Sequence, residues 1–542
     1  MDDAFAIADI RAQRGKKSGM IRIVINGQDV QAYEKETVLE ASRRHHIHIP
    51  TLCYLKDINA IGACRMCLIE IEGRERLATA CNCIVEEGMV IYTDSPKVRS
   101  TRKTNAELLL SQHNCECAFC VQSGNCALQH IANDLNILKV PYDKRVKKEP
   151  WYQGYPFIKD SDKCIKCMRC VQVCEKIQGL HVWDILNTGA RTTVDVSENR
   201  RIEDSDCSLC GQCIAYCPVG ALRERDDTDY VWKSIDDKEK ITIIQASASM
   251  LSAWGEELGF ERSQKTINKM IGVLRKIGFD HVVNTDAAYD WMLAEEQREF
   301  LKRLKQQEHM PMLASSCPSW VQFVKAHYPQ MTENLSALKS PQQIMGAIVK
   351  TQYARQFSIE SQQIVSVSLM PCIAKKYEAD LAVMGDAKIG QDVDAVLTIR
   401  EITHMMRTCH IDIEHMEESV FDVLSGFSSG TAEERAELGD VLSAYNGRPW
   451  KEAEFDFYGR KIRIAVATGL SDAAKLMDAV LHQEAVYDFI KVMACPEGCL
   501  ESVKKISVDD RIKDFVFSLS KELLHTDHEA WDMPCDGYIF RN

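Results

Sequence analysis

The chain has 542 residues, 45% hydrophobic and 27% charged, and this length exceeds what one hydrophobic core usually serves. Its 66 basic and 79 acidic residues give a formal net charge of −13, which argues against nucleic acid or an anionic membrane as the main partner. No secretory signal precedes the first basic residues and no apolar run approaches roughly 18 residues, so we expect a cytoplasmic protein without a membrane span.

The cysteines are clustered along the chain. Of 23 cysteines, 17 lie between Cys53 and Cys217, most of them two, three or five residues from a neighbour. In a large chain without a secretory signal, such spacing indicates metal binding rather than disulfides. A series of metal sites is therefore expected in the N-terminal part of the chain.

Residues 20–98 alternate short apolar runs (IRIVI, CLIEI, MVIYT) with turns, which predicts a small sheet-rich domain. A C-x2-C pair inside a loop, with one cysteine before it and one after, is typical of a β-grasp domain that binds a [2Fe–2S] cluster. The expected ligands are Cys53, Cys64, Cys67 and Cys81. A zinc site would use the same residue types, but the sheet pattern favours iron. Cys83 is expected to be a bystander.

Residues 99–145 are expected to be mainly helical, with helices at AELLLSQH and CALQHIANDLNIL. They contain the motif HNCECAFCVQSGNC, in which one histidine and three cysteines are spaced for a [4Fe–4S] cluster. The expected ligands are His113, Cys117, Cys120 and Cys126. One anionic ligand fewer should raise the potential of this cluster. A zinc site is the alternative, and Cys115 lies off the spacing and is expected to be free.

Residues 146–230 form the next expected domain, after a polar, proline-bounded linker at 139–156. The runs CIKCMRCVQVC and CSLCGQCIAYCP flank a short β-like insert and are typical of ferredoxins with two [4Fe–4S] clusters, in which the fourth cysteine of each run binds the other cluster. One set is then Cys164, Cys167, Cys170 and Cys217, and the other is Cys207, Cys210, Cys213 and Cys174. One-electron relay is the function implied.

Residues 240–542 alternate apolar strands (ITIIQAS, IVSVSLM, RIAVATG) with amphipathic segments such as 252–278. This alternation predicts α/β layers with parallel strands. The chain contains no GxGxxG or GxxxxGK phosphate loop, so we expect no nucleotide or flavin site in it.

Three motifs of this last domain, ASSCPSW (314–320), MPCIAKKYE (370–378) and VMACPEGC (492–499), resemble those of the [FeFe]-hydrogenase catalytic domain. The stretch NLSALKSPQQ (334–343) also resembles that family. The resemblance implies a two-lobed α/β catalytic domain within a multidomain α+β and α/β chain. It also implies one further [4Fe–4S] cluster, bridged through Cys499 to a diiron centre with CO, cyanide and dithiolate ligands. The cysteines implied are Cys317, Cys372, Cys495 and Cys499.

The same resemblance assigns roles to further residues. Lys375 would bond a cyanide ligand, where a cation suits a buried anion; the alternative is a surface lysine beside Lys376. Met370 and Met493 would line the diiron centre, although core packing explains them equally well. The implied proton path consists of Glu296, Glu299, Arg303 and Ser336. The alternative for the path is an exposed helix with an ion pair between residues four apart.

Three departures from the family pattern stand out. Ser316 occupies the position of the family's proton-relaying cysteine, and a hydroxyl is far less acidic than a thiol, so proton delivery should slow by orders of magnitude. LESVKKIS follows Cys499 in place of a glycine-rich turn, which indicates a reshaped pocket. QASASM (245–250) and GFSSGTAEE (426–434) replace two other pocket segments.

Two hypotheses follow. The first is a slow or sensory [FeFe]-hydrogenase that interconverts protons and H2, with electrons relayed to ferredoxin or to an NAD(P)H-oxidising flavoprotein. The second is an electron-transfer subunit of an NAD(P)-linked complex whose C-terminal domain keeps only its [4Fe–4S] cluster. A structural zinc protein is disfavoured because too many sites follow iron–sulfur spacing. Cys409 and Cys535 are isolated and are expected to be buried or free thiols.

Overall fold

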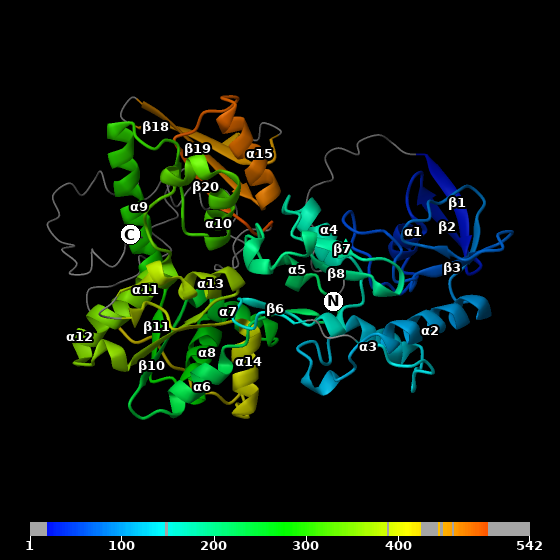
Figure 1. Cartoon of the computed structure of the whole chain (residues 1–542), viewed down its shortest axis with the longest axis horizontal. Coiled ribbons are helices and arrows are strands. Elements are labelled where there is room, and N and C mark those ends of the chain that lie inside the picture. Colours follow the sequence, from blue (N-terminus) through cyan, green and yellow to red (C-terminus); the bar gives the residue numbers. More distant parts are fainter. Residues whose placement is uncertain are drawn as a thin grey trace. The chain divides into compact units, whose positions relative to one another are not determined.

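The computed structural model describes residues 19–146, 150–386, 390–423, 443–444, 448–457 and 460–496. The chain forms two compact units, one of Met1–Ser205 with Gln212–Glu224 and one of Asp206–Gly211 with Arg225–Asn542. In Figure 1 the first unit runs mainly from blue to teal and the second from green to orange. None of the described helices is long and apolar enough to cross a membrane.

The first unit begins with a five-stranded sheet in the order β2–β1–β5–β3–β4. Its elements are β1 (Met20–Ile25), β2 (Gln28–Tyr33), α1 (Val38–Arg44), β3 (Leu68–Ile71), β4 (Ala78–Thr79) and β5 (Val90–Tyr92). Asn26 and Gly27 turn β1 into β2 with φ of 53° and 81°, which these two residue types tolerate. A capping box between Thr37 and Glu40 starts α1. Apolar side chains of β1 and α1 share one core, so the expected β-grasp fold is confirmed.

The remainder of the first unit carries the other N-terminal cysteines except Cys207 and Cys210, which fall in Asp206–Gly211 of the second unit. Its elements are α2 (Pro96–Ser111), α3 (Ala127–Asp134), β6 (Phe157–Lys159), α4 (Arg169–Lys176), β7 (Trp183–Leu186), β8 (Thr193–Val196), α5 (Gln212–Ala215) and β9 (Leu222–Glu224). Strand β6 pairs with β9, and β7 with β8, both antiparallel; the second pair is the insert expected between the cysteine runs. Helix α3 ends before residue 138, its expected end, because Asn136 adopts a left-handed φ of 47°.

The second unit contains a four-stranded parallel sheet in the order β11–β10–β13–β16. Its strands and the helices near them are α6 (Thr228–Asp236), β10 (Ile241–Ala246), α7 (Ala248–Glu257), α8 (Gln264–Ile277), β11 (His281–Asn284), β13 (Ile364–Leu369), β16 (Ala395–Leu397) and α14 (Ile399–Thr408). Ile244 and Val282 belong to the core on one face, and Ile243 and Val283 to the core on the other. Because side chains alternate along a strand, both faces of the sheet are covered, as expected for α/β layers.

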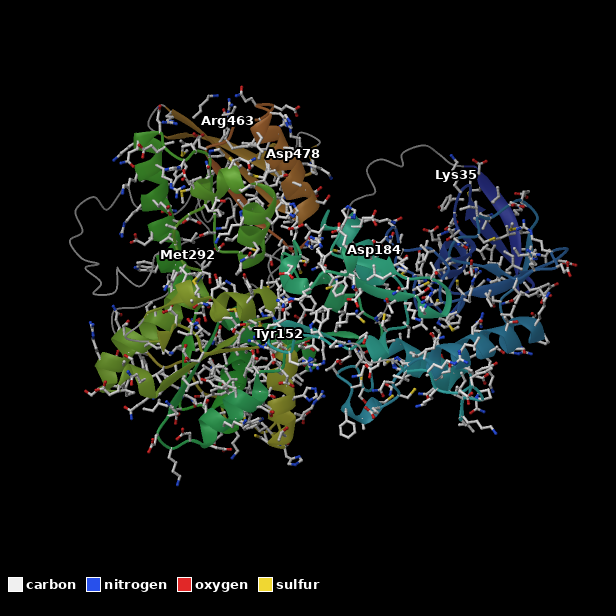
Figure 2. All side chains as sticks on the ribbon, viewed as in Figure 1. Lys35, Tyr152, Asp184, Met292, Arg463 and Asp478 are labelled. Carbon is white, nitrogen blue, oxygen red and sulfur yellow. The ribbon has the colours of Figure 1, made fainter. Side chains whose placement is uncertain are left out.

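A second sheet has the order β12–β20–β19–β18–β17, with β12, β20 and β19 parallel and the other two antiparallel. Its strands are β12 (Met312–Leu313), β17 (Ser443–Ala444), β18 (Lys451–Phe457), β19 (Arg460–Thr468) and β20 (Phe489–Met493). The remaining elements are α9 (Asp286–Gln306), α10 (Pro318–His327), α11 (Pro341–Ile348), α12 (Ala354–Phe357), α13 (Ile373–Asp380), β14 (Gly385–Asp386), β15 (Gly390–Gln391) and α15 (Leu470–Leu481). Phe300 and Leu304 of α9 pack on this sheet. Tyr328 donates a hydrogen bond to Asp478 of α15 at 2.9 Å, and Figure 2 labels Asp478.

The expected amphipathic segment 252–278 is two helices rather than one. Helix α7 ends at Glu257, and Gly259 then takes a φ of 91°, which breaks the helical path. Ser263 starts α8 by accepting a hydrogen bond from the Thr266 backbone at 3.1 Å. Both helices contribute apolar side chains to the same core.

Candidate metal centres

The four cysteines expected to hold the [2Fe–2S] cluster lie together and are buried in the first unit. The thiol of Cys53 donates a hydrogen bond to Cys64, which lowers the pKa of Cys64 to about 6. A hydrogen bond with Cys81 likewise lowers the pKa of Cys67. Two close pairs of sulfurs fit a cluster in which each of two irons takes two thiolates. Cys83 is only partly buried, and its thiol donates to the Ile84 carbonyl instead.

This pairing predicts the outcome of two matched substitutions. Replacing Cys67 by alanine removes one sulfur of a pair, so the reduced protein should lose its [2Fe–2S] electron paramagnetic resonance (EPR) signal and about two irons per chain. The Cys83→Ala variant should keep both. EPR spectra and iron analysis of the two purified proteins check this. A Cys67→Ala protein with an unchanged [2Fe–2S] signal would contradict the ligand set.

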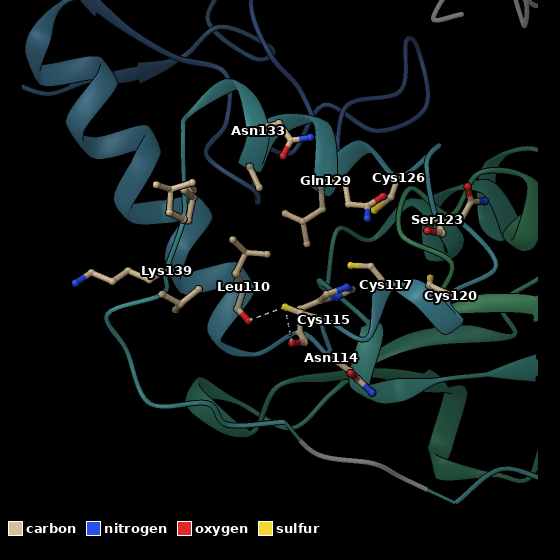
Figure 3. A pocket seen from close by; sticks show the side chains of 17 residues that line it. Leu110, Asn114, Cys115, Cys117, Cys120, Ser123, Cys126, Gln129, Asn133 and Lys139 are labelled. Atoms are coloured by element: carbon tan, nitrogen blue, oxygen red, sulfur yellow. Dashed lines mark hydrogen bonds between the residues drawn. The ribbon is translucent and has the colours of Figure 1, made fainter.

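The histidine and cysteines of the next predicted site surround a cavity of about 230 Å³. Figure 3 shows Cys117, Cys120 and Cys126 around it, beside Cys115. Nδ1 of His113 donates to the Lys163 carbonyl at 2.9 Å, so Nε2 is the nitrogen left for a metal. Burial lowers the pKa of His113, which favours the neutral, metal-binding imidazole. These residues fit a cluster with one histidine ligand.

Cys115 lines the same cavity without matching the ligand spacing. Its thiol lies 3.3 Å from the His113 carbonyl and 3.8 Å from the Leu110 carbonyl, the two contacts drawn in Figure 3. Burial raises the pKa of this thiol. A protonated thiol that donates to the His113 and Leu110 carbonyls agrees with the expectation that Cys115 is not a metal ligand.

The first ferredoxin-type set is brought together from two distant parts of the chain. Cys164, Cys167, Cys170 and Cys217 all line one cavity of about 30 Å³. Burial raises the pKa of Cys167 to about 12. A thiol with a raised pKa can still bind iron, because the metal displaces its proton. The meeting of Cys217 with the first run fits the exchange of fourth ligands between two cubane clusters.

The second ferredoxin-type set stays a prediction. Cys174 lies near the end of α4 and Cys213 lies on α5, and these two helices pack together in the first unit. Cys207 and Cys210 lie in the segment before α5. In the described part of the chain, no three histidine, cysteine, aspartate or glutamate side chains are spaced to hold a single metal ion.

Three of the four C-terminal cysteines fall at the ends of elements in the second unit. Cys317 is the N-cap of α10 and Cys372 the N-cap of α13, and these helices pack together. Cys495 follows β20, which runs parallel to β12 just before Cys317. The carboxyl ends of adjacent parallel strands lie at one edge of a sheet, so both thiols are delivered to the same edge. Cys499 lies outside the described residues, as do LESVKKIS and GFSSGTAEE.

Lys375 is buried, with 2% of its surface exposed, so the alternative of a surface lysine is wrong. Its ammonium donates to the Ser316 carbonyl at 3.2 Å and to Glu378 at 3.3 Å. Glu378 also accepts from the Ser340 hydroxyl at 2.6 Å. The ammonium is therefore held beside the residue that precedes Cys317, where it can bond an anionic ligand.

Part of the predicted proton path forms a connected group. Glu299 accepts from Arg303 at 2.6 Å and from the Ser336 hydroxyl at 2.5 Å. The ion pair between Glu299 and Arg303 expected in the alternative is present. However, these side chains are only 15% and 13% exposed, so this part of the helix is not exposed to solvent as that alternative supposed. Glu296 lies one turn earlier on α9 and is 1% exposed.

Sequence reasoning missed Lys491 of β20, which faces Glu296 of α9. Lys491 Nζ lies 3.6 Å from Glu296 Oε2, and both side chains are nearly inaccessible. The signal was present in the sequence, because a lysine interrupts the apolar strand FIKVM directly before a cysteine motif.

The two methionines assigned to the diiron pocket are core residues of the second unit. Met493 belongs to the core formed by α9 and the second sheet, and Met370 packs with Val393 and Val396. Each is 5% exposed. The core-packing alternative therefore accounts for both, and their role in a pocket stays a prediction. Cys409 is partly buried against the core of the parallel sheet.

Family profiles match the chain in four places. "Iron only hydrogenase large subunit, C-terminal domain" matches residues 240–502. "2Fe-2S iron-sulfur cluster binding domain" matches 18–96 and "NADH-ubiquinone oxidoreductase-G iron-sulfur binding region" matches 102–141. "NADH-quinone oxidoreductase subunit 3, ferredoxin-like domain" matches 156–223. The matched ranges contain all the predicted cluster ligands.

Curated relatives cover most of the chain. The NADP-reducing hydrogenase subunit HndD of Solidesulfovibrio fructosivorans is 36% identical over 524 residues, which span 89% of this chain and 88% of the relative. Iron hydrogenase 1 of Clostridium pasteurianum is 32% identical over 510 residues, again 89% and 88% of the two chains. The NADPH-Fe(3+) oxidoreductase subunit alpha of Geobacter sulfurreducens is 35% identical over 204 residues, 38% of this chain and 24% of the relative.

Proposed function

Because this chain belongs to the family of iron-only hydrogenase large subunits, we propose that it interconverts protons and H2, slowly or as a sensor. It is a hydrogenase-like iron–sulfur oxidoreductase with N-terminal domains of the NADH-oxidoreductase type. The observation that carries the proposal is the burial of Lys375 against the Ser316 carbonyl, next to Cys317. Glu378 holds this buried ammonium at 3.3 Å, and a cation so placed can also bond an anionic ligand bound beside Cys317.

The residues of the second unit would serve that reaction in separate ways. Cys317, Cys372 and Cys495, with Cys499, would hold a [4Fe–4S] cluster joined to a diiron centre, which when bound supplies the site where H2 is split or formed. Lys375 would orient and neutralise anionic ligands of that centre. Ser316 would pass protons between the centre and Glu296, with Glu299, Ser336 and Arg303 continuing the path.

A second candidate is an electron-transfer subunit whose C-terminal domain keeps only its [4Fe–4S] cluster. Two features of the chain favour it. Ser316 provides a hydroxyl where rapid proton relay calls for a more acidic group. The Lys491 ammonium lies 3.6 Å from Glu296, so the carboxylate in the middle of the path is engaged in an ion pair. Both features suit a protein that moves electrons more readily than protons.

We infer that the electron partner is an NAD(P)H-oxidising flavoprotein subunit, with ferredoxin as the alternative. The N-terminal profiles belong to NADH-oxidoreductase subunits, and relatives are named as an NADP-reducing hydrogenase subunit and an NADPH-Fe(3+) oxidoreductase subunit. This chain contains no phosphate-binding loop of either common type, so nicotinamide chemistry would belong to the partner.

An infrared spectrum decides between the two candidates. The protein should be made with the machinery that assembles the diiron centre, purified without oxygen and searched for CO and cyanide stretching bands. Bands together with H2 turnover support the hydrogenase. A protein whose iron content accounts for the [2Fe–2S] and [4Fe–4S] clusters, but which shows no bands, is the electron-transfer subunit.

A further inference from the structure

One buried asparagine of the first unit contacts ligand residues of two different predicted clusters. The Nδ2 atom of Asn59 donates to the Cys53 carbonyl at 2.8 Å and to the Cys167 carbonyl at 2.9 Å. Cys53 belongs to the [2Fe–2S] set and Cys167 to a [4Fe–4S] set. Both partners are carbonyls and can only accept, so the amide nitrogen must be the atom that faces them. A single side-chain atom therefore joins the two sites.

The position of this amide is fixed by its surroundings. Asn59 is fully buried, and its backbone exchanges two hydrogen bonds with Leu55 at 2.8 Å, which closes the loop after Cys53. Among the described residues, no donor lies within hydrogen-bond distance of Asn59 Oδ1. The amide nitrogen satisfies two buried carbonyls that a leucine would leave unpaired, at the cost of one unsatisfied oxygen of its own. The two hydrogen bonds therefore fix the amide between the two ligand residues.

Two other hydrogen bonds join the same loop to α4 without touching a ligand residue. Arg169 donates to the Tyr54 carbonyl at 3.0 Å, and Lys176 donates to the Ile58 carbonyl at 2.6 Å. Cys53 and Cys167 also share one hydrophobic core. Several interactions therefore hold the loop against α4. Of these hydrogen bonds, only those of Asn59 connect one ligand residue to another.

We propose that Asn59 carries the electronic coupling between the [2Fe–2S] cluster and the [4Fe–4S] cluster of Cys164, Cys167, Cys170 and Cys217. The route runs from the Cys53 sulfur along its own backbone to the carbonyl, through the Asn59 amide, and back along Cys167 to its sulfur. One electron leaves the reduced [2Fe–2S] site and reduces the oxidised [4Fe–4S] site, with no proton moved and no bond exchanged. Coupling decays more slowly through bonds and short hydrogen bonds than across space. Asn59 is thus a positioning residue, and its role rests on the proposed cluster assignment.

The test compares Asn59→Leu, which removes both donors at similar volume, with Lys176→Met, which removes a hydrogen bond of the same loop without touching a ligand residue. Flash photoreduction of the reconstituted full chain would inject one electron, and transient absorption would follow its redistribution between the two clusters. EPR-monitored redox titration would give both potentials, and magnetic coupling between the reduced clusters would report their separation. We expect Asn59→Leu to slow the exchange several-fold with potentials and separation unchanged, and Lys176→Met to match the wild type.

Other outcomes have clear meanings. An unchanged exchange rate in Asn59→Leu, with both EPR signals intact, overturns the coupling role while leaving the proposed function standing. If the leucine variant loses a cluster, Asn59→Ser decides, because its short hydroxyl cannot reach both carbonyls: slowed exchange supports the role and wild-type exchange overturns it. A wild-type protein that lacks either EPR signal removes the cluster assignment itself, and the role of Asn59 falls with it.

Discussion

The Ser316→Cys variant is expected to turn over H2 about 10²-fold faster than the wild type, or more, if the diiron centre is present. A thiol with a pKa of about 8.5 exchanges protons near neutral pH, whereas the serine hydroxyl does so poorly. The Ser316 carbonyl already accepts from Lys375, and this bond uses the backbone, so the substitution leaves it in place. The measurement is H2 evolution and uptake by anaerobic protein whose infrared bands show equal loading of both variants.

Ser315→Cys is the matched control for this prediction. Ser315 is adjacent and buried, but its hydroxyl donates to the Leu338 carbonyl at 2.9 Å and has no assigned role in proton transfer. A cysteine there should leave turnover near that of the wild type. If both variants, fully loaded, remain as slow as the wild type, Ser316 does not limit the reaction. Glu296, which pairs with Lys491, would then be the residue to alter.

The Lys376→Met variant is expected to lose about 3–5 kcal/mol of folding free energy in the second unit. The Lys376 ammonium is fully buried and contacts Glu401 at 3.0 Å and Asp227 at 2.8 Å. Asp227 keeps its second partner, Arg225, at 2.8 Å, so the loss falls mainly on Glu401, which would be left as a buried and uncompensated charge. Urea denaturation of the full chain without oxygen would measure the shift in midpoint.

The pH dependence of this loss gives a second test. Burial raises the pKa of Glu401, and Lys376 opposes that effect. Removing Lys376 should raise the pKa of Glu401 further, so the folded state would bind a proton more tightly than the unfolded state. Stability of the variant should then fall as pH rises, and its deficit should be smaller at pH 5 than at pH 8.

Lys475→Met is the control for the Lys376 prediction, because Lys475 pairs with Asp472 at 2.7 Å on the surface, where its side chain is 58% exposed. Its loss should cost about 0–1 kcal/mol. Equal shifts in the two variants would mean that the buried network contributes no more than a surface pair.

Local spacing explains why the N-terminal sites could be predicted from sequence. Cys164, Cys167 and Cys170 lie within one short run, so their convergence follows from the run itself. The addition of Cys217 follows from the pattern of two such runs, which the shared cavity supports. The β-grasp fold was likewise expected from alternating apolar runs and turns together with the cysteine spacing.

Contacts between distant segments could not be predicted in this way. Lys375 and Lys376 look like exposed residues of a helix, and their burial depends on partners contributed by Ser316, Glu401 and Asp227. Asn59 contacts Cys167, which lies 108 positions away in the sequence, and no periodic pattern of residues predicts that contact. The break between α7 and α8 was missed because the amphipathic pattern continues on both sides of Gly259.

The hydrophobic core of the first unit has a consequence for damage by oxygen. Cys53, Cys126 and Cys167, which belong to three predicted clusters, are members of one apolar cluster of side chains. Loss of the metal centre at one of these cysteines would leave a cavity in the core that also packs around the other two. The looser packing would then admit solvent and oxidant to the remaining clusters. Oxidative injury should therefore spread through this unit rather than stop at one centre.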